Sequence, residues 1–342
     1  MYRNIFVILY LLCSQANAQT LGGNAVFNFL AQPNTAHLSA LGGVNISSIS
    51  KDVGMAFHNP ALLRDSMDQQ LNTSFYTISD AVKQFGLNTA FHIASINSNI
   101  GLGVQYLNYG SLTQTDASGN MIGSFKPADY VVQLMFSKPY KERWWYGLTA
   151  KFINSSYGPY HSNGLAFDVG ITYYDSDNQL QASVVAKNMG TQLATYNGSK
   201  QKEELPFDLQ VGITKRLLNA PFQFSLTAHH LQHFNIFYND TLFNTQEGDD
   251  RFIAKTGAQK LLSHFVFSTE IFLSEQFQIS AGLNLLRRQS LNAFNMSSGL
   301  NGFSFGFAVL LNKIHIRYAT GFYQQNLFHQ FSLNFNLKAN PL

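Results

Sequence analysis

The densest group of potential metal ligands in the sequence is the histidine-rich stretch HHLQH at residues 229–233, after an alternating apolar segment that begins at Phe222. On an extended strand, His229 and His233 share a face but stand about 13 Å apart, too far to share a metal ion unless the chain bends. Neither a cysteine nor a carboxylate lies beside them at ligand spacing. We therefore expect no metal site, and we interpret these imidazoles as strand-end or interfacial residues.

Other groups that could carry chemistry are weaker. The acidic stretch 247–250 and the Asp175–Asp177 turn contain carboxylates but lack the further oxygen ligands and final glutamate of a calcium loop such as the EF-hand. The one G-x-S-x-G match, from Gly302 to Gly306, lies in an alternating strand segment and not at a strand-to-helix turn, so it frames no nucleophile elbow. The sequence therefore predicts no catalytic residue, no cofactor and no metal, although a hydrolase needing only a Ser–His pair at a strand rim stays open as a weak alternative.

Composition indicates what kind of fold carries these residues. Charged residues make up only 12% of the chain and aromatic residues 14%, which is few charges for a soluble domain. Beyond the first residues no apolar run approaches the roughly 18 residues of a spanning helix. A membrane β-barrel fits both observations, because its alternating strands hide their apolar half from hydropathy averages.

The N-terminus predicts export. Residues 1–18 contain Arg3, an apolar stretch and the small-residue box Ala16-Asn17-Ala18, which together are typical of a secretory signal peptide. Cleavage there removes Cys13, the single cysteine, and with it any disulfide or cysteine metal site. The 22 basic residues then fall to 21 against 19 acidic ones, which gives no reason to expect a nucleic-acid partner.

From residue 69 to 338 the sequence divides into segments of about ten residues with period-two alternation, such as the stretch from Phe303 to Leu311. We count about fourteen, and we predict an all-β, antiparallel transmembrane barrel followed by a tail at 339–342. Long connections at 111–126, 190–204, 234–260 and 288–302 are expected to face outward. A periplasmic sandwich or propeller is the soluble alternative, but it normally places more charge on its outer face.

Residues 19–68 are predicted to form a hatch that plugs the barrel. Its motif consists of the turn residues Gly42 and Gly43 and of Asn59, Pro60 and Ala61, where proline stops the preceding segment and can begin a short helix. The alternative is a loop that caps the edge of a domain.

A charged pair, Lys51-Asp52, lies in the middle of the predicted hatch. Charges inside a barrel lumen can pair with wall residues such as Lys151, Asp168 or Arg317 and hold a plug in place. An exposed pair at the periplasmic mouth is the alternative.

Several motifs resemble known families. The Leu-Gly-Gly at Leu41 and the AFHNPALL stretch at Ala56 resemble the FadL-like barrel group. With VQYLNYG at Val104, KNMGTQL at Lys187, LPFDLQVG at Leu205 and TAHHL at Thr227, nearly the whole mature chain resembles the PorQ family of outer-membrane components of the type IX secretion system.

This resemblance implies a non-enzymatic outer-membrane protein of a Gram-negative bacterium. Its expected partners are a PorZ-like surface protein and, in the same attachment complex, PorU-like and PorV-like proteins that join secreted cargo to anionic lipopolysaccharide. The FadL-like plan implies an alternative, a transporter of hydrophobic compounds. The chain departs from many outer-membrane barrels in ending on Leu342 and not on phenylalanine.

Overall fold

The computed structural model describes residues 25–77, 81–236, 256–290, 299–323 and 326–337. The signal peptide predicted for residues 1–18 and the tail predicted for 339–342 lie outside the described residues.

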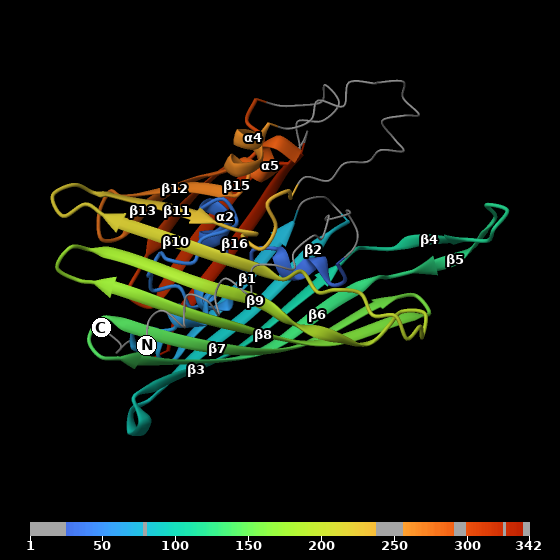
Figure 1. Ribbon diagram of the computed structural model, residues 1–342, viewed down its shortest axis with the longest axis horizontal. Coiled ribbons are helices and arrows are strands. Elements are labelled where there is room, and N and C mark those ends of the chain that lie inside the picture. The colour runs from blue at the N-terminus through green and yellow to red at the C-terminus, as the bar shows by residue number, and fades with distance from the viewer. Residues whose placement is uncertain (1–24, 78–80, 237–255, 291–298, 324–325, 338–342) are drawn as a thin grey trace, which may run out of the picture.

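Fourteen antiparallel strands form a closed barrel (Figure 1). The strands are β1 (Gln70–Thr77), β2 (Lys83–Ile93), β3 (Ser98–Asn108), β6 (Ala128–Tyr140), β7 (Trp144–Tyr157), β8 (Tyr160–Asp175), β9 (Leu180–Ala194), β10 (Asp208–Arg216), β11 (Phe222–Ala228), β12 (Phe265–Phe272), β13 (Phe277–Asn284), β14 (Phe303–Leu310), β15 (Ile314–Tyr323) and β16 (Asn326–Asn336). The ring closes where β1 pairs with β16, from Gln70 opposite Asn336 to Thr77 opposite His329. The predicted fold class and strand number are confirmed, and the sandwich and propeller alternatives are wrong.

Alternation along each strand separates an apolar outer face from a small or polar inner face. In β14, Phe305 and Phe307 are exposed, whereas Ser304 and Ala308 are buried toward the lumen. Exposed phenylalanine, leucine, isoleucine and valine side chains occur on almost all of the other strands of the ring. An outer surface of this kind suits lipid and is costly in water.

The connections differ between the two ends of the barrel. At one end the turns are short, including the turn with η5 (Ala94–Ile96) between β2 and β3. At the other end the connections are mostly longer and carry the hairpin β4 (Leu112–Thr115) and β5 (Met121–Phe125) and the helices α4 (Gly257–Leu262) and α5 (Leu285–Ser290). One predicted boundary is wrong: residues 190–194 of the expected loop 190–204 continue β9, because they still pair with β8.

The wall has unequal height. Strands β6 to β9 have 13 to 16 residues, whereas β10 to β14 have 7 to 9. The hairpin β4–β5 projects still further from the tall side, as Figure 1 shows at the right of the view. None of the helices in the described ranges is long and apolar enough to cross a membrane.

Candidate functional site in the barrel lumen

The chain before β1 passes through the ring of strands. Its short helices are η1 (Asn28–Ala31), α2 (Ala36–Ala40), η2 (Val53–Phe57), η3 (Pro60–Leu62) and η4 (Asp65–Met67). Helix α2 contacts β13 to β16, whereas η3 contacts β6 to β8 on another part of the ring. Figure 1 shows this segment in blue, enclosed by the strands. We call residues 25–68 the N-terminal segment.

The predicted hatch motif forms turns within this segment. Gly42 and Gly43 have φ values of 91° and 82°, a region that glycine adopts without strain. The Asn59 side chain accepts a hydrogen bond from the Ala61 N–H at 2.9 Å and donates one to the Ile46 carbonyl at 2.7 Å. Pro60 opens η3, where its missing N–H costs little.

Glycines in the wall make room for the backbone of the N-terminal segment. A Cβ on Gly147 of β7 would collide with the Pro60 carbonyl carbon and the Ala61 nitrogen. A Cβ on Gly282 of β13 would collide with the Gly42 nitrogen. Backbone approaches this close on two separate strands mean that the segment is fitted to this barrel along its length.

A buried carboxylate connects the segment to β16 and β15. Asp52 accepts hydrogen bonds from the Asn334 amide at 2.8 Å and from the Thr35 hydroxyl at 2.7 Å, and it lies 4.0 Å from Arg317 Nε. Burial alone raises the pKa of Asp52, but the charges of Arg317 and His37 and these hydrogen bonds outweigh it and hold the pKa below its ordinary value. Of the wall partners named from the sequence, Arg317 is the one that Asp52 reaches.

The other two wall residues named from the sequence pair with each other. Lys151 of β7 lies 2.6 Å from Asp168 of β8 and also donates to the Asn188 side chain at 2.8 Å. Both members of the pair are buried, and each has a compensating hydrogen bond, as a buried ion pair requires.

A second ionic contact joins the segment to β12. His37 of α2 lies 2.7 Å from Glu270, and the Ser48 hydroxyl donates to the other oxygen of the same carboxylate at 3.0 Å. The Ser47 hydroxyl lies 2.7 Å from the Thr214 hydroxyl of β10. The segment is therefore held to several strands by polar contacts between buried side chains.

A bulge in β9 contributes a third contact. The register against β8 shifts between Phe167 and Val169, so that Lys187 and Asn188, although consecutive, are both buried on the lumen side. Lys187 Nζ lies 2.7 Å from His58 Nδ1. Burial, followed by the charges of Lys187 and Lys151, holds the pKa of His58 well below its ordinary 6.5.

Several cavities adjoin the segment, and three of them bear on its function. A polar cavity of about 880 Å³ lies at the short-turn end and is lined by Lys51, Gln181 and Arg317 among others. A cavity of about 300 Å³ lies beside the low side of the wall, which the short strands β10 to β14 form, and is lined by His58, Lys187 and Asp208 among others. A third, of about 400 Å³, lies at the long-connection end of the tall wall.

The third cavity is aromatic, and we call it the aromatic pocket. Its ring-bearing side chains are Phe27, Phe29, Tyr109, Tyr157, Tyr160 and Tyr196. The Tyr109 hydroxyl donates to Asp129 at 2.6 Å, and burial raises the pKa of Tyr109 far above its ordinary value. The pocket adjoins an apolar cluster that runs from Phe27 to Phe57 in η2 and to Val131 and Ile153 in the wall.

Tyr109 and Trp145 face inward, although aromatic residues near strand ends are typical of the lipid–water interface. Tyr109 lines the aromatic pocket. The ring of Trp145 lies 3.7 Å from the guanidinium of Arg64 in the N-terminal segment, whereas its neighbours Trp144 and Tyr146 are exposed. Strand alternation explains the difference, because consecutive residues point to opposite faces.

The structure brings part of the histidine stretch together with a residue that sequence reasoning missed. Asp208, His229 and His230 each offer a ligand atom within 4.8 Å of the others. The chain bends after β11, with φ of 55° at His230, and the carboxylate comes from the neighbouring strand. His233 is outside this group. Only strand pairing, in which Val211 lies opposite Ala228, could have placed Asp208 here.

Comparison with known proteins gives the fold. No family model matches the sequence, and no curated protein matches it. Among solved structures, a TodX deltaS2S3 mutant, a monoaromatic hydrocarbon channel, is 13% identical with a TM-score of 0.53, covering 89% of this chain and 99% of its own. The monoaromatic hydrocarbon channel CymD is 10% identical with a TM-score of 0.53, covering 90% of this chain and 97% of its own. These similarities show the fold alone, a closed antiparallel β-barrel like those of the two channels.

Proposed function

We propose that this protein is a non-enzymatic outer-membrane channel of a Gram-negative bacterium that takes up small hydrophobic compounds, with the N-terminal segment as its gate. The observation that carries the proposal is the aromatic pocket at the mouth of the barrel, which adjoins an apolar cluster inside it. An apolar cavity of about 150 Å³ is enough to hold benzene, so a cavity of about 400 Å³ accommodates a substituted single ring. The similar folds of TodX and CymD, both monoaromatic hydrocarbon channels, support the same substrate class.

The apolar cluster next to the pocket supplies a route inward. It lies between the N-terminal segment and the tall wall, and it ends at Phe57 of η2. A hydrophobic molecule leaving the aromatic pocket finds apolar side chains in this direction. Passage along it requires the N-terminal segment to move, because Phe57 and Ile153 are buried in contact with their neighbours.

A reversible cross-link tests the gate. The hydroxyls of Ser47 and Thr214 are 2.7 Å apart, and both belong to short side chains, so Ser47→Cys with Thr214→Cys places two thiols within reach of a disulfide. The only native cysteine is Cys13, inside the predicted signal peptide. Uptake of radiolabelled toluene is measured in cells that produce this variant, before and after oxidation.

We expect oxidation to reduce uptake to the level of cells without the protein, and dithiothreitol to restore it. The single variant Ser47→Cys is the matched control and should be insensitive to oxidant. Undiminished uptake by the fully cross-linked double variant would show that the segment does not gate transport. Equal uptake with and without the protein would refute the channel itself.

A second candidate function rests on the hairpin β4–β5. Met121 is 83% exposed and Ile122 59% exposed, although the hairpin projects from the barrel at the long-connection end. Exposed apolar side chains at a projecting tip are typical of a protein contact. They favour the docking role implied by the PorQ-like motifs, in which the barrel anchors a PorZ-like surface protein in a complex with PorU-like and PorV-like proteins that acts with anionic lipopolysaccharide.

Affinity purification of the tagged barrel from detergent-solubilised outer membranes separates the two candidates. Stoichiometric recovery of a large surface protein, lost in the variant Met121→Ser with Ile122→Ser, would support docking. The matched control is Leu218→Ser, which removes an exposed apolar side chain at the opposite, short-turn end. Recovery of the barrel alone would count against docking and leave the channel.

A further inference from the structure

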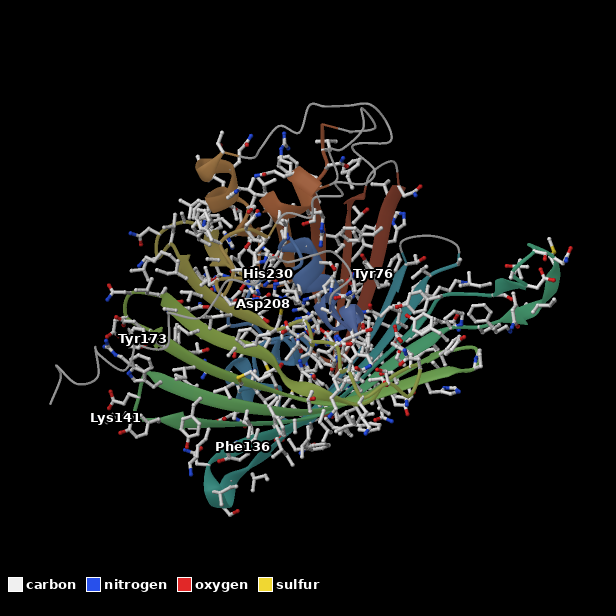
Figure 2. The ribbon with its side chains drawn as sticks, turned by 45° about the vertical axis from the view of Figure 1, so that its right-hand side comes forward. Tyr76, Phe136, Lys141, Tyr173, Asp208 and His230 are labelled. Atoms are coloured by element: carbon white, nitrogen blue, oxygen red, sulfur yellow. The ribbon has the colours of Figure 1, made fainter. Side chains whose placement is uncertain are left out.

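Two neighbouring strands bring two imidazoles and a carboxylate to one place at the low side of the wall. Asp208 is the first residue of β10, and His229 and His230 follow directly after β11. One ligand atom of each lies within 4.8 Å of the other two. Figure 2 shows Asp208 and His230 next to each other near the blue helix in the middle of the molecule.

The backbone holds this arrangement in place. The His230 N–H donates to Asp208 Oδ1 at 2.6 Å, and the His229 N–H donates to the His264 carbonyl at 2.9 Å. His264 Nδ1 in turn lies 2.8 Å from the His229 carbonyl. The left-handed φ of His230 is what turns its ring toward Asp208 after the strand has ended.

The ring nitrogens and the carboxylate lie close to one another. His229 Nδ1 and His230 Nδ1 lie 2.5 Å apart, and His230 Nδ1 lies 3.7 Å from Asp208 Oδ2. His229 is 2% exposed, and its Nε2 has no hydrogen-bond partner among the described residues.

We propose that Asp208, His229 and His230 bind a divalent transition-metal ion of the Zn²⁺ type, with a further coordination position facing the cavity of about 300 Å³ that all three residues line. Two imidazoles and one carboxylate form a ligand set that proteins use for zinc with an open position. Zn–N bonds of about 2.0–2.1 Å place two nitrogens of a tetrahedral site roughly 3.4 Å apart. The two rings must therefore separate by about 1 Å, which the half-exposed ring of His230 can do by rotation.

Two nearby cations set the affinity. Lys187 and Arg287 line the same cavity, and the charge of Arg287 also acts on His229. Both repel a bound metal ion. Neutralising Arg287 should therefore strengthen metal binding, a direction of change that a purely structural histidine pair does not produce.

Calorimetric titration of the metal-stripped barrel, purified without a histidine tag, with Zn²⁺ tests the site. We expect one saturable site per chain, at least a tenfold loss of affinity in His230→Ala, and a severalfold gain in Arg287→Gln. His233→Ala, in the same stretch but outside the group, is the matched control and should bind like the unmodified protein. In Co²⁺ titrations the visible absorption of a four-coordinate site should appear and be lost in His230→Ala.

Three results would overturn the proposal: no saturable binding by the unmodified barrel, unchanged affinity in His230→Ala, or an equal loss in His233→Ala. His230 is the residue chosen because its ring is half-exposed and its removal leaves the buried His229 and the bonds of β10 in place. Each measurement is a binding measurement on the folded barrel, so its result does not depend on whether the protein transports anything.

Discussion

Replacing Asp52 by asparagine removes one charge at the centre of the N-terminal segment without changing its size. The carboxylate faces Arg317 Nε at 4.0 Å and His37 Nδ1 at 3.9 Å, and it accepts from Asn334 and Thr35. An asparagine keeps one oxygen for these donors, but it presents an N–H₂ group where the second oxygen accepted. Arg317, which is 3% exposed, is left without its opposite charge.

The size of the destabilisation follows from leaving the buried charge of Arg317 without a partner. Breaking a buried ion pair by removing one partner costs about 3–5 kcal/mol, because the other charge stays buried and uncompensated. Tenfold in an equilibrium constant corresponds to about 1.4 kcal/mol. The population in which the N-terminal segment is released from the wall should therefore increase by a factor between about one hundred and several thousand. Strand pairing in the barrel should be unaffected.

Hydrogen exchange of the backbone amides measures this population directly. In Asp52→Asn, the amides of residues 35–63 should exchange faster by that factor, and those of β7 and β8 should not change. The matched control is Lys51→Ala, because Lys51 is the exposed neighbour of Asp52 and its removal should leave exchange within about twofold. Unaltered exchange of residues 35–63 in Asp52→Asn would refute the idea that this ion pair holds the segment. Recovery of protection in the variant that also carries Arg317→Met would confirm that an unpaired charge is the cause.

Three further perturbations test other contacts of the segment. Gly147→Ala places a Cβ against the backbone at Pro60 and should accelerate amide exchange of η3 at least tenfold. Gly123→Ala in β5, whose added Cβ lies 3.7 Å from the nearest atom, of Gln114, is the control and should not. Equal exchange in the two variants would contradict the close approach. The pKa of buried His58 is below its ordinary 6.5, so the imidazole binds a proton more readily when the segment is released. The segment's amides should therefore be fully protected from exchange above pH 6.5. Below that pH the free energy of release should fall by up to about 1.4 kcal/mol per pH unit. His58→Gln should remove this pH dependence. Arg64, whose pKa burial lowers to about 9, should be replaceable by methionine with stability unchanged or raised by about 1 kcal/mol in thermal unfolding, and a loss above 2 kcal/mol would mean that its cation–π contact dominates.

Much of the fold could be predicted from the sequence because a barrel wall repeats one local rule. Each strand alternates between lipid and lumen, so Phe305 and Phe307 indicate their side of the wall without knowledge of any other strand. The turn chemistry of Pro60 is local in the same way, and it matches the short helix that the structure contains. Trp145 shows the limit of composition: aromatic residues near strand ends are typical of the membrane interface, but alternation places this ring inward on Arg64.

Contacts between distant parts of the chain could not be predicted in the same way. Asp208 lies 21 positions before His229 in the sequence, and only the antiparallel register of β10 and β11 makes them neighbours. Lys187 and Asn188 both face the lumen because of a bulge in β9 at this point. Wall residues Arg317, Lys151 and Asp168 were named together as partners of the hatch, yet the choice among them depends on where Asp52 stands in the lumen.

The contacts that hold the N-terminal segment to the wall bear on whether this segment can act as a gate. A segment held mainly by apolar contacts exposes apolar surface to water when it moves, and the free-energy cost rises with every side chain released. This segment is held by apolar clusters and also, at His37, Ser47 and Asp52, by polar partners on three strands. Water can replace the polar partners once it enters the lumen. Release of the segment is therefore cheaper than its buried area suggests, and it lets the segment separate from the wall near Phe57, where a hydrophobic molecule would pass.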